Sequence, residues 1–363
     1  MVKGSNRKSN IECLRIIAML GILACHLVSH GVENSISGNL YWQGSTFNRF
    51  WGLLFLQGGS IGNAIFFMIT GYFCAGGYNE SFSINSVKKV VLETIFYAWI
   101  SIFVTAVFFL IKKLPPNLKM TDIINFNIKA IFIPATGGGW WFVSTYLLLM
   151  LLTPTINHMI KSFSDKKYII ILLVFWMLWY SIASLDADYS KLQAGIFFYL
   201  WGGWRRTHGL RKLRPILILG EILYLIWLLV VSVGMIPRFT GLMEVALKYG
   251  NDLLVTAFFI PATVILLFDF FEQLSFESVF LNNVAKVTFG VYLFSDSIIA
   301  RGFWDYLFHV DTWYLTKYFV PYAVGVILLV YIISGMVDCI RQTYVEGSME
   351  RVLQKAIARW EQI

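Results

Sequence analysis

An arginine and a histidine, Arg15 and His26, lie in one apolar stretch near the N-terminus. They are eleven positions apart, and eleven steps of an α-helix nearly complete three turns, so both side chains share one face. The helical rise separates them by about 16 Å, roughly half the apolar thickness of a bilayer. A neutral imidazole can take a proton from a hydroxyl near neutral pH, and a guanidinium suits phosphate. The pair predicts a base deep in a membrane and an anion-binding cation at its edge.

Each residue of the pair also has a structural interpretation that stays open. A membrane histidine often only hydrogen-bonds between helices, and an arginine at a helix end often reaches lipid headgroups. His30 follows one turn later and Glu33 comes back to nearly the same face if the helix continues. Either could orient the imidazole or contact an acceptor, although a loop carboxylate is also expected to be solvated. Asp296, in a late apolar segment, is the further acid that we expect to orient the histidine or to pair with Arg301.

The composition shows what positions these side chains. Hydrophobic residues make up 58% of the chain and charged residues only 14%, with a mean hydropathy of +0.67. A soluble domain carries roughly 25% charged residues, so we expect an all-α polytopic membrane protein. The formal charge of +8 then reflects membrane topology rather than nucleic-acid binding. The four cysteines form no C-x-x-C pair, so neither a metal site nor a disulfide framework is indicated.

Apolar segments predict about ten spans. They lie near residues 12–31, 52–75, 90–111, 139–156, 168–185, 193–204, 215–236, 249–268, 286–300 and 318–338. The sixth and ninth are short and are expected to tilt, break or line a cavity. Most lysines and arginines lie on the side of the N-terminus, which predicts that both termini are cytoplasmic. The loop 112–138 is the exception, with four lysines on the opposite side.

The end of the chain differs from the rest. Met349, Val352 and Leu353 repeat at helical spacing, with Arg351 and Lys355 between them. Such a pattern is typical of an amphipathic helix on a membrane surface. We therefore divide the chain into a transmembrane domain, 1–340, and a cytoplasmic amphipathic tail, 341–363.

Three motifs resemble one family. Arginine, ten residues and then histidine in the first span resembles the signature of the acyltransferase-3 membrane family. The segment 62–72, with Phe66 and Phe67 before a Thr-Gly pair, is similar to the second-span pattern of that family, with threonine replacing the usual serine. Gly138-Gly-Trp-Trp-Phe142 is similar to its Trp-Phe segment. The resemblance covers most of residues 10–340 and implies that the transmembrane domain, 1–340, is an acyltransferase domain.

The chain also departs from the family pattern. The late span of that family often reads Tyr-Leu-x-His, but Ser295 stands where the histidine would be. The arginine-rich start of the third span is reduced to Lys88 and Lys89. The first of these departures puts the contribution of the late histidine in doubt.

The resemblance implies a multi-pass protein of the cell membrane that acylates a glycan. The donor would be a cytoplasmic acyl-CoA, usually acetyl-CoA, with no permanently bound cofactor, and the acceptor a sugar hydroxyl on a surface or lipid-linked polysaccharide. His26 would be the general base or an acyl relay, and Arg15 would hold the donor. Trp140, Trp141 or Tyr292 could stabilise the developing oxyanion, although a Trp pair at a span end also fits an interfacial belt.

Some features have competing explanations. Arg205 and Arg206 begin a basic stretch that sets topology and could also attract the phosphates of the donor. The run Gly58–Gly62 matches G-x-S-x-G, but it opens an apolar helix and fits close helix packing better than a nucleophile elbow. A transporter or flippase for a lipid-linked sugar is the alternative function, with His26 as proton relay and Arg15 as anion anchor.

Overall fold

The computed structural model describes residues 7–32, 40–75, 84–116, 118–132, 139–183, 187–209, 213–234, 255 and 258–360. Within these ranges the chain forms helices and no strand. The helices are α1 (Ser9–Gly31), α2 (Leu40–Gln43), α3 (Thr46–Cys74), α4 (Ile84–Leu110), α5 (Met120–Phe132), α6 (Trp141–Lys161), α7 (Asp165–Ala183), α8 (Ala187–Thr207), α9 (Arg214–Gly234), α11 (Ile260–Gln273), α12 (Val279–Ala285), α13 (Thr288–Ser295), α14 (Ile298–Tyr306), α15 (Val310–Tyr314), α16 (Phe319–Ile340), the π-helical turn η3 (Arg341–Val345) and α17 (Glu346–Trp360).

The chain is an all-helical, multi-pass membrane protein. In the part that the structure describes, six helices are long and apolar enough to cross a membrane: α1, α3, α4, α6, α9 and the continuous α16–α17 rod. Helices α7, α8 and α11 occupy further expected segments but are not among these six. The count of about ten spans therefore stays a prediction.

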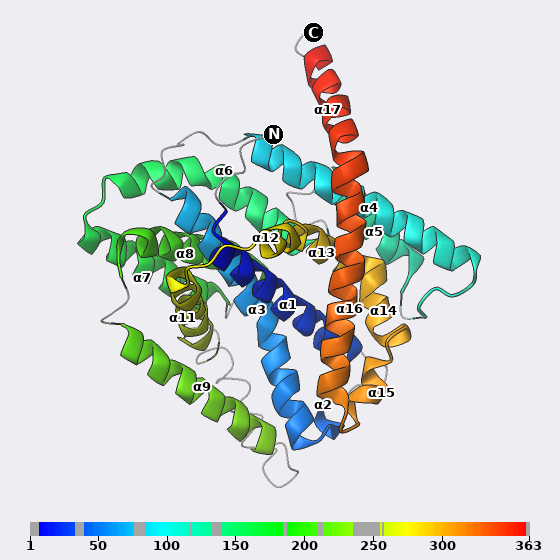
Figure 1. The fold of residues 1–363 in the computed structure, drawn as a ribbon, viewed down its shortest axis with the longest axis horizontal. Coiled ribbons are helices and arrows are strands. Elements are labelled where there is room, and N and C mark those ends of the chain that lie inside the picture. Colours follow the sequence, from blue (N-terminus) through cyan, green and yellow to red (C-terminus); the bar gives the residue numbers. More distant parts are fainter. Residues whose placement is uncertain are drawn as a thin grey trace.

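Helix α1 occupies the centre of the bundle (Figure 1) and packs against α3, α11, α12, α13, α14 and α16. Its approach to α3 depends on glycine. A Cβ added to Gly58 would lie 3.0 Å from the Cα of Gly21 and would collide with its carbonyl. Only residues without a side chain let two backbones come this close. The run Gly58–Gly62 thus packs helices, and its Ser60 is exposed in the middle of α3 rather than in a turn.

The ninth apolar segment breaks in two, which is one of the outcomes expected from its short length. Helix α13 ends at Ser295, and Ser297 begins α14 with an extended backbone and a hydroxyl that accepts from the N–H of Ala300 at 3.4 Å. A serine in this position satisfies one of the free N–H groups of the new helix. The break leaves Asp296 between two helix ends, inside the protein and 3% exposed.

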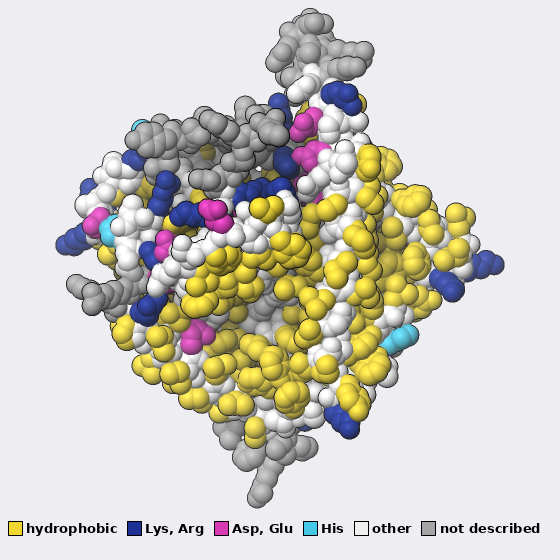
Figure 2. Space-filling model, viewed as in Figure 1, with side chains coloured by type: hydrophobic (Ala, Val, Ile, Leu, Met, Phe, Trp, Pro, Cys, Tyr) yellow, Lys and Arg dark blue, Asp and Glu magenta, His cyan; other side chains and the backbone are white. Residues whose placement is uncertain are grey.

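Helix α1 begins and α16 ends toward the same end of the bundle, the upper end in Figure 1. Figure 2 shows charged side chains gathered toward this end and a broad hydrophobic surface below them. This arrangement agrees with an even number of spans, while the side of the membrane on which the termini lie stays a prediction. Helix α17 continues the line of α16 beyond the bundle (Figure 1), so the expected C-terminal helix forms, and its placement on a lipid surface stays a prediction.

Candidate active site

Four side chains meet in the interior of the protein: two from α1, one from the α13–α14 break and one from α14. Nε2 of His26 lies 3.7 Å from Oδ1 of Asp296, and Nε2 of His30 lies 3.8 Å from the same oxygen. Nε of Arg301 donates to that oxygen at 2.9 Å. The sequence suggested that Asp296 would orient His26 or pair with Arg301, and in the structure it lies beside both. We call these four residues the His-Asp-Arg cluster.

The cluster is anchored on its far side. A second nitrogen of Arg301, Nη2, donates to the carbonyl of Gly139 at 3.4 Å, and the guanidinium lies 5.3 Å from the centre of the Phe126 ring. The acid is therefore held by a cation that two other segments keep in place. On the other side, Nδ1 of His26 is buried and has no hydrogen-bond partner among the described residues. With Nε2 facing the carboxylate, Nδ1 is the ring nitrogen left to act as a base.

Two aromatic side chains separate the cluster from a pocket. The ring centre of Tyr292 lies 6.3 Å from that of His26 and 5.5 Å from that of Phe142. Tyr292, Phe142 and Ile22 all line the pocket, and Ile22 precedes His26 by one turn of α1. Tyr292 thus lines the pocket with one part of its side chain and contacts His26 of the His-Asp-Arg cluster with another.

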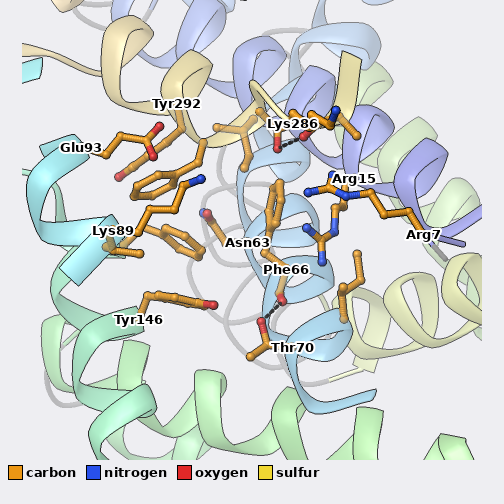
Figure 3. Close-up of a pocket in the computed structure, with 17 residues that line it drawn as sticks. Arg7, Arg15, Asn63, Phe66, Thr70, Lys89, Glu93, Tyr146, Lys286 and Tyr292 are labelled. Atoms are coloured by element: carbon orange, nitrogen blue, oxygen red, sulfur yellow. Dashed lines mark hydrogen bonds between the residues drawn. The ribbon is translucent and has the colours of Figure 1, made fainter. Parts of the chain in front are cut away.

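The pocket has a volume of about 240 Å³ and opens among four cations. These residues, Arg7, Arg15, Lys89 and Lys286, are here called the cation rim. Figure 3 shows Arg7 and Arg15 on one side of the pocket and Lys89 with Glu93 on the other. Deeper in, the lining is mainly apolar, with Phe66, Phe142 and Phe289 among its members. A cationic mouth over an apolar interior fits an elongated ligand with an anionic head.

Acidic partners neutralise only part of this rim. Glu93, which also lines the pocket, lies 3.1 Å from a guanidinium nitrogen of Arg341. Lys89 forms an ion pair of 2.9 Å with Glu346 of α17. Glu12 lies 3.5 Å from Arg7 and 4.0 Å from Arg15, so one carboxylate faces two guanidinium groups. The mouth therefore keeps a positive balance suited to phosphate.

The other residues expected from the sequence lie elsewhere. Arg205 forms ion pairs with Asp269 at 2.7 Å and with Glu272 at 2.8 Å, and Arg206 is exposed on the surface. Neither arginine lines the pocket. The guanidinium of Arg205 instead links α8 to α11.

The Trp pair directly follows Gly139, whose carbonyl accepts from Arg301 of the cluster. Trp140 is 1% exposed, with its ring 4.9 Å from that of Phe126, and Trp141 packs its ring beneath the ammonium of Lys191 at 4.9 Å. A role of either indole at the reacting carbonyl stays a prediction. Glu33 falls outside the described residues.

The lining residues that were not singled out from the sequence include Arg7, Lys286 and Asn63. The two cations come from segments far apart in the chain, and only the contact of α12 with α1 brings them together. Asn63 could have been found from the sequence, because it is a polar amide within the apolar segment that contains Phe66 and Phe67. Such a residue in a span is a candidate functional group by its cost of burial alone.

Comparison with known proteins bears on the whole chain. No match was found among curated proteins or among solved structures. Residues 8–336 match the family model Acyl_transf_3, described as an acyltransferase domain. This match includes all three motifs noted in the sequence and both the pocket and the His-Asp-Arg cluster, except for Arg7. The chain therefore belongs to the acyltransferase-3 family.

Proposed function

We propose that this protein transfers an acetyl group from cytoplasmic acetyl-CoA to a sugar hydroxyl of a cell-surface or lipid-linked polysaccharide. The observation that carries the proposal is the position of His26. Its ring faces Asp296 on one side and is separated by Tyr292 from a cation-rimmed pocket on the other. A base and a pocket for an anionic donor are what acyl transfer from a thioester needs.

The donor would enter with its phosphates at the cation rim. Coenzyme A carries a diphosphate and a ribose phosphate at one end and the acyl thioester at the other. Arg15 lines the pocket on the same helix as His26. The helical rise between these two residues, about 16 Å, separates the phosphate-binding end from the reacting end of the site.

The acceptor hydroxyl would meet the thioester beside His26. Nδ1 of His26 takes the hydroxyl proton as the oxygen attacks the thioester carbonyl, so a C–O bond forms and the C–S bond breaks. The departing sulfur then receives that proton, and the products are the acetyl ester and free coenzyme A. Asp296 faces the imidazole and would favour its transient positive charge, and Arg301 would hold Asp296 in place.

The walls near the histidine favour a short acyl group. Tyr292 is 4% exposed and Phe142 is 6% exposed, and their rings are in edge-to-face contact. Any acyl group that reaches His26 has to move this pair, and an acetyl group requires the smallest displacement. Acetyl is therefore the acyl group that we propose.

The test uses purified protein in detergent or nanodiscs, acetyl-labelled acetyl-CoA and cell-envelope glycan. Wild type is expected to release free coenzyme A and to label the glycan, and His26→Ala to lose at least about a hundredfold of this activity. His158→Ala is the matched control, because His158 lies in the last turn of α6 and does not line the pocket. Full activity in His26→Ala would exclude the assigned base. Movement of an intact lipid-linked sugar across proteoliposomes without thioester cleavage would instead support the transporter interpretation.

A further inference from the structure

Asn63 has a buried amide oxygen that no described residue satisfies. It lies on α3, is 8% exposed, and its Oδ1 has no hydrogen-bond partner in the described part of the chain. It lines the pocket, and Figure 3 shows it between Lys89 and Tyr292 on one side and Phe66 on the other. A buried polar atom without a partner destabilises the protein. A ligand that supplies the missing partner would remove this cost.

One polar neighbour of Asn63 on the same helix is already satisfied. Thr70, the next polar lining residue along α3, already donates its hydroxyl to the carbonyl of Phe66 at 2.8 Å. The lining beside Asn63 combines the apolar Phe66 with Lys89 and Tyr292 (Figure 3). A carboxamide there is suited to a ligand group that both donates and accepts hydrogen bonds.

The depth of Asn63 follows from the packing of α3 on α1. Its neighbour Gly62 packs directly against Ala18 and Ile22 of α1. Ile22 precedes His26 by four residues, or about 6 Å of helical rise. Asn63 therefore lies between the level of Arg15 and the level of His26, about one turn short of the proposed base.

We propose that Asn63 hydrogen-bonds the amide of the donor nearest to its thioester. This inference rests on the proposed function and specifies how that site would recognise the arm of acetyl-CoA. The arm ends in an amide, two methylene groups and the sulfur, so the amide and the reacting carbonyl are separated by a distance comparable to one helical turn. With the carbonyl beside His26, this amide lies at the level of Asn63. The carboxamide and the secondary amide each offer a donor and an acceptor, so they are complementary.

The experiment compares acetyl-CoA with an analogue in which that amide is replaced by two methylene groups. For wild type, kcat/KM is expected to fall about tenfold with the analogue, the loss of one buried hydrogen bond. Asn63→Leu, similar in size but apolar, is expected to lose about tenfold with acetyl-CoA and nothing further with the analogue. Asn127→Leu is the matched control: Asn127 is 0% exposed and also has a buried Oδ1 without a partner, but lies on α5 outside this pocket. It should discriminate between the donors as wild type does.

Equal discrimination by Asn63→Leu and wild type would overturn the inference while leaving the proposed function intact. An inactive wild type would instead overturn the proposed function, and the inference with it. Protection of the purified protein against thermal unfolding by free coenzyme A gives a readout without catalysis, with the weaker protection expected for Asn63→Leu. If Asn63→Leu fails to fold, Asn63→Ser, which leaves a smaller side chain, is measured in its place against the same donors.

Discussion

A single oxygen of Asp296 organises the reacting end of the site. It accepts from Arg301 at 2.9 Å and faces Nε2 of both His26 and His30, at 3.7 and 3.8 Å. Two imidazoles cannot both take the best position at one oxygen that already accepts from a guanidinium. His26 is nevertheless the residue in ring contact with the pocket wall, through Tyr292. This asymmetry makes His26 the base in our proposal and leaves His30 on the side away from the donor pocket.

Asp296→Asn tests the charge of this acid while keeping its shape. The variant leaves the charge of Arg301 without its partner and removes the carboxylate that would favour a positive imidazole. We expect kcat to fall about a hundredfold or more, with little change in the KM for acetyl-CoA, because Asp296 does not line the pocket. Steady-state kinetics on protein that elutes as wild type in detergent measures both. Asp311→Asn, the same change beside the exposed Thr312, is the control, and a rise in KM alone would contradict the assignment.

Arg15→Gln tests the donor end. Loss of a charge-assisted contact to phosphate is expected to raise the KM for acetyl-CoA about tenfold or more and to weaken its dependence on salt. The rate at saturating donor should stay near that of wild type. Arg206→Gln provides the comparison, since Arg206 was expected from the sequence to attract phosphates but lies outside the pocket. An equal rise in KM for both variants would favour general attraction by the basic surface over a contact with Arg15.

At the scale of elements, the site depends on how closely α1 and α3 approach. Gly58→Ala would place a methyl group 3.0 Å from the Cα of Gly21, so the two helices must separate. Gly325→Ala on α16 is the matched control, because an added Cβ there meets nothing within 4 Å and alanine favours a helix by about 1 kcal/mol. Thermal unfolding in detergent should show a lower midpoint for Gly58→Ala and an unchanged or higher one for Gly325→Ala. A midpoint for Gly58→Ala at or above that of wild type would show that the contact is not tight.

The helices could be predicted from the sequence because apolar runs and their length are local properties. The expected segment 12–31 became α1 (Ser9–Gly31) and 318–338 became α16 (Phe319–Ile340). The exact position of the break, at Asp296 and Ser297, could not be predicted. The segment 286–300 is one apolar run, and a serine inside such a run does not by itself show that a new helix begins there. The sequence likewise left open whether Asp296 would face His26 or pair with Arg301. Both contacts form, and they depend on tertiary packing that the sequence does not reveal.

The basic stretch that begins at Arg205 shows what sequence reasoning misses when the partners of a residue are distant in the chain. Arg205 could be read as a phosphate ligand because its partners, Asp269 and Glu272, lie more than sixty residues away in the chain. An arginine that pairs with two acids is no longer free for a ligand, and nothing in the local sequence reveals the pairing. The cation rim is the converse case, because Arg7 and Lys286 become neighbours only when α12 packs on α1.

At the scale of the whole molecule, the proposed reaction needs access from two sides. The cation rim lies at the end of the bundle where α1 begins, and α17 extends beyond the same end (Figure 1). The His-Asp-Arg cluster lies farther along α1, next to the start of α14 and the carbonyl of Gly139. A cytoplasmic donor would thus enter the pocket from one end of the bundle, and an acceptor at the outer surface would approach the His-Asp-Arg cluster from the other. This arrangement requires α17 to be cytoplasmic and α15 to be external.

Cysteine labelling tests that orientation in a variant whose four native cysteines are replaced by serine. Ser348→Cys on α17 and Thr312→Cys on α15 introduce thiols at two exposed positions. In intact cells a membrane-impermeant maleimide is expected to label Thr312→Cys only, and permeabilised cells should show both labelled, because a charged reagent does not cross the bilayer. Labelling of Ser348→Cys in intact cells would place the cation rim outside. Cytoplasmic acetyl-CoA could not then reach Arg15, and the proposed direction of transfer would have to be reversed.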